Sequence, residues 1–388
     1  MRTSHLFSVV PLFLFAVGLG FLGCSDQEPA PVASPQPETS ANDISQELRA
    51  ELAQLEHIAS MPDRGTSYWV SDAPGINRPT SIVELPAGSI DGLAAALASA
   101  GNNGTVLIRA GTHTESGMAT ISERVRLIGE PGAIMMFDTP PDPTGYDVHP
   151  AIRVLASHVT IWGLEIRPPG SAGGTAILLK NSQHALIANN TFRDQHLGVF
   201  VDGGDKSMVW GNTIVCAPTT TDPMGIVNCN GKQVHIAGNN VTNALFGIWA
   251  CDENGVLVGN NVHANLIGII LCKVPANAYT LPGNETVGSD APGAGWVVTG
   301  NQATGNFWGY LVIDSANRNL LTNNAASNSI VYDVELTADT FRFGFLTPAS
   351  YDNRFIAGSN PNIVVKNCGN NNTIVGGQLV NNTTDPCF

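Results

Sequence analysis

Charged side chains are scarce in this chain of 388 residues: 13% are Asp, Glu, Lys or Arg, and 18 basic residues stand against 32 acidic ones. The formal net charge of -14 repels a polyanion, so we expect no nucleic-acid partner. Because 43% of the residues are hydrophobic, the chain is not a disordered one, and it is long enough to bury a large core.

Metal-ligand motifs are also missing. Four histidines, His184, His196, His235 and His263, are dispersed over different parts of the sequence without the spacing of a metal site. We therefore predict no metal and no cofactor.

The N-terminus has the layout of a secretory signal, because an apolar run follows Arg2 and ends just before Cys24. Its last residues, phenylalanine-leucine-glycine before the cysteine, resemble a bacterial lipobox. The resemblance implies a signal peptide over 1–23, a lipid on Cys24 as the only membrane contact and, from Ser25, sorting to the outer membrane. Residues 24–43 are rich in Pro, Ala, Ser, Gln and Glu and are predicted to form a disordered tether.

Six asparagines recur at one position of a sequence repeat. Each has an apolar residue three positions before it and another two positions after it, and the spacings are 22, 27, 21, 41 and 23 residues. We call this set the asparagine ladder: Asn190, Asn212, Asn239, Asn260, Asn301 and Asn324. An asparagine tolerates the left-handed backbone of a tight turn, and its amide can bond the equivalent amide in the next repeat. The longest gap contains a loop over 273–295 that is rich in Pro and Gly.

A second series in phase with the ladder consists of short strands that open on a glycine, such as Phe246-Gly247-Ile248-Trp249-Ala250. Alternate residues of such a strand point inward and outward. The pattern predicts an all-β protein, a right-handed parallel β-helix of about ten coils at about 4.8 Å per coil, over residues 80–388. A leucine-rich repeat is the alternative for this period, but its consensus and its helical half are missing.

Two short helices are expected before the β region. Residues 44–60 place apolar side chains on one helical face after a capping box that begins at Asp43. Ser89 as N-cap and Gly101 as the stop bound a second helix over 89–100. Because open strand edges invite aggregation, we expect this second helix to cap the first coil.

The glycine-isoleucine strands, the asparagine turns and the lead-in from Leu107 to His113 resemble the pectin-lyase-like superfamily, which includes carbohydrate-binding proteins and sugar hydrolases. The resemblance covers about 80–385 and is specific for the fold, which hosts many functions. It implies that a polysaccharide lies along the outward side of the glycine-isoleucine strands, which we call the outer face.

The outer face is predicted to carry two columns of side chains, and both are mostly apolar. The first outer column is Leu178, Phe200, Val227, Trp249, Ile270 and Leu311. The second outer column is Lys180, Asp202, Cys229, Cys251, Cys272 and Ile313.

Four carboxyl groups lie on or near the outer face: Asp202, Asp205, Asp252 and Glu253. Glycoside hydrolysis needs two carboxyls about 5–9.5 Å apart, a distance that side chains two coils apart can meet. Solvated turn positions are the alternative, since Asp and Glu are common there. The paired aspartates of polygalacturonases and the Asp-Pro-His motif of alginate epimerases are absent. No catalytic motif is therefore identifiable, and an enzyme of this type would be a polysaccharide lyase or a glycoside hydrolase.

Phe200, Trp249 and Trp308 lie on or next to the outer face and are candidates for stacking on sugar rings. The alternative is that they pack beneath the 273–295 loop, which leaves the same face.

Three cysteines, Cys229, Cys251 and Cys272, follow one another in the second outer column. Neighbouring coils hold equivalent Cα atoms about 4.8 Å apart, inside the disulfide range of about 4.4–6.8 Å, and an exported location favours oxidation. Among the many possible pairings of the mature cysteines, we predict Cys216–Cys229, Cys251–Cys272 and Cys368–Cys387. A soft-metal site on stacked thiolates is the alternative, and it resembles the β-helix proteins of periplasmic copper processing.

Together these features predict a monomeric protein, lipid-anchored in the cell envelope, that binds a polysaccharide, with processing of that polysaccharide as an open option. A non-catalytic structural or adhesive lipoprotein is the main alternative, and soft-metal (copper) handling is a further one.

Overall fold

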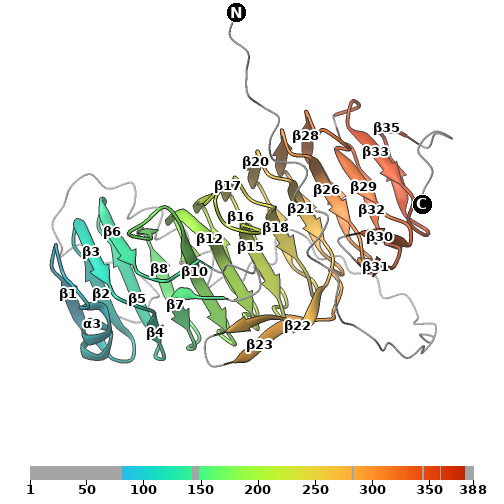
Figure 1. Cartoon of the computed structure of the whole chain (residues 1–388). Coiled ribbons are helices and arrows are strands. Elements are labelled where there is room, and N and C mark those ends of the chain that lie inside the picture. The colour runs from blue at the N-terminus through green and yellow to red at the C-terminus, as the bar shows by residue number, and fades with distance from the viewer. Residues whose placement is uncertain (1–80, 142–147, 282–283, 343–344, 359, 381–388) are drawn as a thin grey trace, which may run out of the picture.

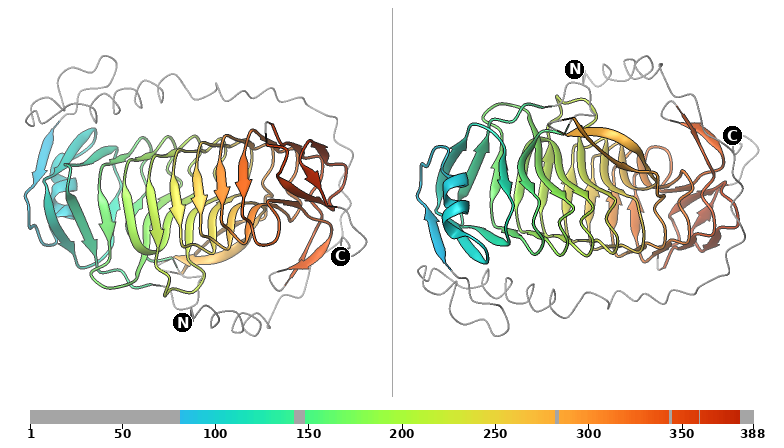
Figure 2. Two further views of the ribbon diagram at one scale, coloured as in Figure 1. Left: turned by 90° about the horizontal axis from the view of Figure 1, so that it is seen from above. Right: turned by 90° about the horizontal axis from the view of Figure 1, so that it is seen from below.

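The computed structural model describes residues 81–380, apart from 142–147, 282–283, 343–344 and 359. The predicted signal peptide, tether and helix over 44–60, with Cys24 and Cys387, lie outside the described residues. Within them the chain winds into an elongated stack of parallel strands (Figures 1 and 2). Each coil contributes up to three strands, and equivalent strands of successive coils pair side by side in three rows.

Row A is a sheet of twelve strands in sequence order. It consists of β1 (Ile82–Leu85), β2 (Gly104–Ile108), β5 (Val125–Gly129), β8 (Thr160–Trp162), β11 (Leu186–Ala188), β13 (Met208–Trp210), β16 (His235–Ala237), β19 (Val256–Val258), β24 (Val297–Thr299), β27 (Leu320–Thr322), β32 (Arg354–Ile356) and β34 (Thr373–Val375). Twelve strands mean about twelve coils, more than the ten we predicted, because the end coils have the least regular sequences.

Row B carries the glycine-isoleucine strands. It consists of β4 (Ala119–Ile121), β7 (Pro150–Val154), β10 (Gly173–Lys180), β12 (Thr191–Asp202), β15 (Met224–Cys229), β18 (Phe246–Ala250), β21 (Ile267–Leu271), β26 (Trp308–Val312), β29 (Val334–Leu336), β33 (Val364–Asn367) and β35 (Gln378–Leu379).

Row C joins row B through β12, whose first residues pair in row C and whose last residues pair in row B. The other members of row C are β3 (Gly111–Glu115), β6 (Ala133–Phe137), β9 (Glu165–Arg167), β14 (Thr213–Cys216), β17 (Asn240–Thr242), β20 (Asn261–His263), β25 (Gln302–Thr304) and β28 (Ala325–Ser327). Two antiparallel hairpins leave the stack: β22 (Val274–Leu281) with β23 (Glu285–Ser289), and β30 (Thr340–Arg342) with β31 (Phe345–Thr347).

The asparagine ladder forms the corner between rows A and C, and its amides connect coil to coil as predicted. The backbone N–H and the Nδ2 of Asn239 both donate to Oδ1 of Asn260, each at 3.0 Å, and the Nδ2 of Asn239 also donates to the carbonyl of Val209 at 2.9 Å. The same three bonds recur from Asn190 to Asn301. These amides thus satisfy buried backbone groups that the turn would otherwise leave without partners.

The left-handed backbone conformation belongs to the residue before each ladder asparagine, and not to the asparagine itself as we predicted. These preceding residues have φ between 52° and 65°, and each is a glycine or an asparagine: Asn189, Gly211, Gly238, Gly259, Gly300 and Asn323. Glycine and asparagine are the residues that adopt this conformation at least cost.

Inward-pointing side chains of the three rows form one continuous core, and alternate residues of row B point outward. At the N-terminal end, helix α3 (Leu93–Ala100) buries its apolar face in the first coils, so the predicted cap is present. The helix ends at Gly101, as predicted. The predicted N-cap is wrong: Ser89 bonds Pro86, while the first helical N–H, of Leu93, donates to Glu115 at 2.9 Å.

Candidate functional site

The two outer columns are formed by the residues that we predicted. Strand register pairs Leu178, Phe200, Val227, Trp249, Ile270 and Leu311 in sequence along row B. The first outer column continues beyond this set, to Arg153 at one end and to Glu335 and Lys366 at the other. The outer face is therefore apolar in its middle and charged at both ends.

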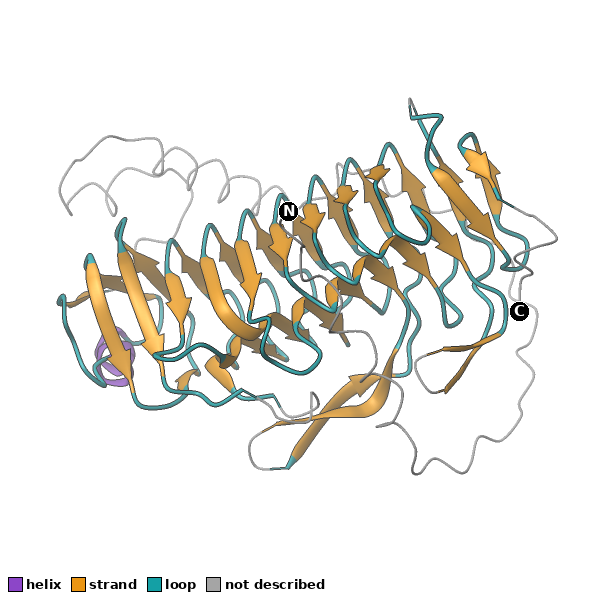
Figure 3. Cartoon of the chain, turned by 45° about the horizontal axis from the view of Figure 1, so that its top comes forward, coloured by secondary structure: helices purple, strands orange, loops and turns teal. Residues whose placement is uncertain are grey.

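The segment expected as a loop over 273–295 is instead the hairpin β22–β23, which folds back along the outer face (Figures 1 and 3). Tyr279 packs edge-on against Phe200 with ring centroids 5.2 Å apart, and its hydroxyl donates to the sulfur of Met224 at 3.3 Å. Val148 donates to the carbonyl of Thr280 at 2.8 Å. The hairpin thus covers the apolar middle, and Phe200 is fully buried rather than available to stack on a sugar.

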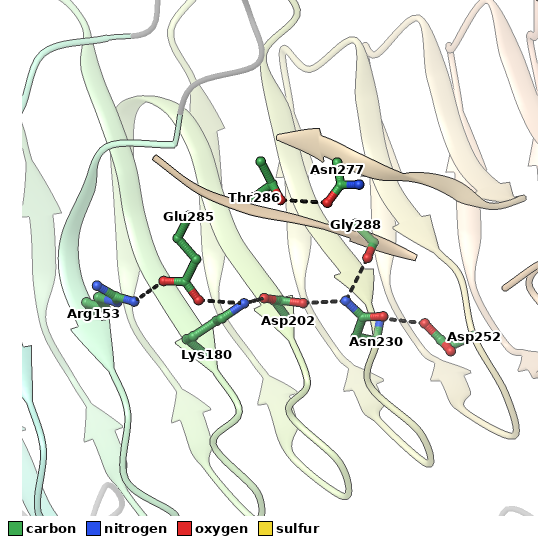
Figure 4. A network of polar contacts seen from close by, with 9 residues as sticks. All are labelled: Arg153, Lys180, Asp202, Asn230, Asp252, Asn277, Glu285, Thr286 and Gly288. Atoms are coloured by element: carbon green, nitrogen blue, oxygen red, sulfur yellow. Dashed lines mark hydrogen bonds and ion pairs between the residues drawn. The ribbon is translucent and has the colours of Figure 1, made fainter. Parts of the chain in front are cut away.

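A chain of polar contacts fixes this hairpin to row B (Figure 4). The carboxylate of Glu285 lies 2.6 Å from Arg153 and 3.1 Å from Lys180, and Lys180 lies 2.5 Å from Asp202. Burial lowers the pKa of Lys180, but the two carboxylates outweigh that effect and the net shift of the pKa is upward. Further along the face, the Nδ2 of Asn230 donates to Asp202 at 2.6 Å and to the carbonyl of Gly288 at 2.9 Å.

The four candidate catalytic carboxylates are all engaged in structural contacts. Asp202 is only 1% exposed and is shared by Lys180 and Asn230. The buried Asp252 accepts the backbone N–H of Asn230, and burial raises the pKa of this carboxyl.

The other two candidates lie on the surface turns beside the face. The carboxylate of Asp205 accepts the backbone N–H of Lys232 at 2.8 Å, and Glu253 lies 3.4 Å from Lys232 Nζ. Both of these carboxylates thus contact Lys232 beside the face.

Polar and aromatic groups gather at the C-terminal part of the outer face, and we call this set the aromatic end: Trp249, Trp308, Tyr332, Glu335 and Lys366. Trp249 and Trp308 are partly exposed. The indole N–H of Trp308 donates to Glu335 at 2.9 Å, and Lys366 Nζ lies 5.0 Å from the ring centroid of Tyr332. The indole N–H of Trp249 is without a hydrogen-bond partner among the described residues.

Our sequence reasoning did not single out Arg153, Glu285, Glu335 or Lys366 as site residues. The weak repeat copies over 332–336 and 362–366 contain Glu335 and Lys366, so extending the first outer column through them would have placed both. No repeat marks Glu285, because it belongs to the inserted hairpin.

The cysteine column is formed as predicted, but the disulfides within it are not. Cys229, Cys251 and Cys272 are free thiols, and so is Cys216. In-register side chains of parallel strands are parallel, so their Cβ atoms are also about 4.8 Å apart, beyond the 3.5–4.5 Å of a disulfide.

The predicted Cys216–Cys229 bridge is wrong for a further reason: Cys216 faces the core, while Cys229 lies on the outer face. Cys368 is disulfide-bonded. Its predicted partner Cys387 lies outside the described residues, so that pairing stays a prediction.

No group of three or more His, Cys, Asp and Glu side chains within the described ranges is arranged to hold a metal ion. Among the helices described, none has the length and apolar character needed to cross a membrane.

Comparison with known proteins identifies one family and several solved structures. Residues 155–281 match the model of a family described as periplasmic copper-binding protein (NosD). No curated protein matches this sequence significantly. A polygalacturonase from Erwinia carotovora ssp. carotovora is 14% identical, with a TM-score of 0.54 over 80% of this chain and 97% of that one.

Two further structures give the same TM-score of 0.54. A family 28 exopolygalacturonase of Yersinia enterocolitica is 12% identical over 78% of this chain and 76% of its own. A mutant tailspike protein of E. coli bacteriophage HK620, solved with a pentasaccharide, is 14% identical over 76% of this chain and 59% of its own. At such identities these likenesses concern the fold, and the chain is a right-handed parallel β-helix.

Proposed function

We propose that this protein binds a polysaccharide at the aromatic end of its outer face and holds it without cleaving it. The proposal is supported by the fold, since polygalacturonases and a tailspike solved with a pentasaccharide have similar structures. We further propose that the protein is exported, in keeping with the periplasmic family that matches residues 155–281, and that it is a monomer tethered to the outer membrane by a lipid on Cys24.

One observation carries the proposal: two partly exposed tryptophans lie on strands β18 and β26 of the outer face. A single strand, β21, separates these two strands, which are therefore about 9.6 Å apart along the stack. Trp308 is in register with Phe246, three residues before Trp249, so the two rings are also offset along the strand direction. Aromatic rings spaced in this way can stack on different sugar units of one glycan chain. Glu335 and Lys366 are buried beside Trp308 and Tyr332, where their contacts hold the two rings in place.

The contacts of the candidate carboxylates support binding without cleavage. Asp202 forms an ion pair with Lys180, and the buried Asp252 accepts the backbone N–H of Asn230. Freeing either one would require the hairpin β22–β23 to leave the face, since both belong to the network that holds it.

A structural or adhesive role without a glycan ligand is the second candidate. The observation that favours it is the hairpin, because it covers the stretch of the outer face that would otherwise form a long groove. The aromatic end is then the feature that favours glycan binding over a purely structural or adhesive role.

The test is a glycan array of acidic and neutral polysaccharides, followed by titration of the best ligand against Trp249→Ala and Trp308→Ala. Loss of one stacking ring should weaken binding about tenfold, which corresponds to about 1.4 kcal/mol. Trp210→Ala is the matched control, because Trp210 is also partly exposed but lies on row A. The absence of any bound glycan, or equal affinities for all three variants, would contradict the proposal and favour the structural role.

A further inference from the structure

The outward side of row A carries an apolar cluster that is separate from the core and from the outer face. Its buried members lie on five adjacent strands, from β2 through β5, β8 and β11 to β13. We call them the row A patch: Leu107, Ile128, Trp162, Leu186, Ala188 and Met208. Their neighbours along the strands, such as Ile161 and Val209, belong to the core. Because alternate residues of a strand point to opposite sides, the patch lies on the outside of the stack.

Strand register makes the patch continuous. Leu107, Ile128, Trp162 and Ala188 follow one another in register across the strands, and Trp210 continues the line. The rings of Trp162 and Trp210, on the strands either side of Ala188, have centroids 6.0 Å apart. From β2 to β13 there are four steps of about 4.8 Å, so the patch extends about 19 Å along the stack. A contiguous apolar surface of this kind marks a contact with another segment or molecule.

The patch is covered, whereas the same face of row A further along is not. Leu186 is 1% exposed and Met208 is 0% exposed. Val256, Val297 and Leu320 stand in the same column on later strands, and they are only partly buried.

The cover of the patch differs from that of the outer face. On the outer face, the apolar cluster includes Tyr279 and Leu281 from the hairpin that lies over it. Within the described ranges, every member of the patch cluster belongs to row A itself. The covering apolar side chains are therefore to be sought in the part of the chain outside these ranges.

We propose that residues 44–60 dock on the row A patch as an amphipathic helix. Leu48, Leu52, Leu55 and Ala59 fall on one helical face, and polar residues such as Glu56 fall on the other. A single helix of this length is marginal in water and gains most of its stability by packing its apolar face. From Leu48 to Ala59 that face is about 17 Å long at about 1.5 Å per residue, close to the length of the patch.

The path of the chain brings this segment to the patch. The described residues begin at Ser81 and enter row A at once through β1, which pairs with β2, the first strand of the patch. Residues 61–80 can span up to about 66 Å when extended at about 3.3 Å per residue. The farthest strand of the patch, β13, is five steps or about 24 Å from β1. The helix can therefore lie across the strands of the patch without passing over another row.

This docking site is independent of the proposed glycan site. The patch lies on row A, whereas Trp249 and Trp308 lie on row B, and the two sites have no residue in common. The predicted tether over 24–43 would then leave the body on a different face from the aromatic end. Failure of either proposal leaves the other standing.

Oxidation of Met208 by hydrogen peroxide, measured by peptide mass spectrometry on the full chain, reports whether the patch is covered. Met118, which is 39% exposed, and Met135, which is 0% exposed in the core, are the fast and slow references. Leu55→Glu places a charge on the apolar helical face and should speed oxidation of Met208 at least tenfold, while Met135 stays slow. Ala53→Glu is the matched control, because it adds the same charge to the opposite helical face and should leave the rate for Met208 unchanged.

A photo-reactive benzoylphenylalanine at position 55 identifies what the segment contacts. We expect cross-links within one chain to peptides that contain β8, β11 or β13. Cross-links to row B, to lipid or to a second copy of the chain would overturn the proposal. So would equal rates of Met208 oxidation in the wild type and in Leu55→Glu.

Discussion

Replacing Asn260 by alanine should destabilise the stack by more than the loss of one hydrogen bond would. The side chain of Asn260 takes part in four hydrogen bonds: it accepts two from Asn239, at 3.0 Å each, and donates to Ile236 at 2.9 Å and to Asn301 at 2.8 Å. Asn260 is fully buried, so no water can replace the lost acceptor. Asn260→Ala therefore leaves the backbone N–H and one amide hydrogen of Asn239 buried without partners.

The magnitude follows from these two donors. A buried donor without a partner costs about 2 kcal/mol, so the free energy of unfolding should fall by about 4 kcal/mol. The loss of stability should also affect the neighbouring coils, because in a solenoid each coil is stabilised chiefly by its neighbours.

Guanidinium denaturation followed by far-UV circular dichroism measures this change. Asn261→Ala is the matched control, since Asn261 is the adjacent, partly exposed asparagine with one side-chain bond, at 3.1 Å, to Asn240. We expect this control to lose about 0.5 kcal/mol. If the two variants unfold at the same denaturant concentration, the role assigned to the asparagine ladder is wrong.

Two further predictions concern the packing and the charges of row B. A Cβ atom on Gly247 would lie 2.3 Å from Val262 and 2.6 Å from the carbonyl of Gly268, so Gly247→Ala should lower the free energy of unfolding by about 3 kcal/mol. Gly170 has open space around it, so the control Gly170→Ala should hardly change that free energy. Equal melting temperatures of the two variants would refute this prediction. Burial raises the pKa of Asp314 from 3.8 to about 6, so its carboxyl destabilises the native state increasingly as pH rises from 4 to 6. Asp314→Asn should therefore raise the melting temperature more at pH 7.5 than at pH 4, and an equal gain at both would contradict the shift.

The sequence was sufficient for the architecture because both of its repeats are physical requirements of the coil. The ladder position needs a side chain that both donates and accepts, and Gly247 stands where the next coil leaves no room for a Cβ atom. Register then followed from the repeat, and it placed Trp249 and Cys251 in their columns correctly.

Contacts that depend on the insertion could not be predicted in the same way. The hairpin β22–β23 has no counterpart in the repeat, so the contact of Glu285 with Lys180 was not foreseen. Packing of Phe200 beneath this segment was one of the two alternatives that the sequence left open, and the structure shows it. The disulfide prediction failed because Cα spacing alone was considered, whereas the parallel direction of the side chains decides whether two sulfurs can join. The position of the hairpin and the direction of the side chains, and not the amino-acid composition, therefore determine which part of the outer face is accessible to a ligand.

Hydrogen exchange followed by mass spectrometry, with and without the best glycan from the array, tests the central claim most directly. The account predicts slower exchange on binding in peptides that cover β18 and β26, which carry Trp249 and Trp308, and unchanged exchange in β13 of row A. Protection confined to row A, or no protection in any peptide at saturating glycan, would contradict glycan binding at the aromatic end.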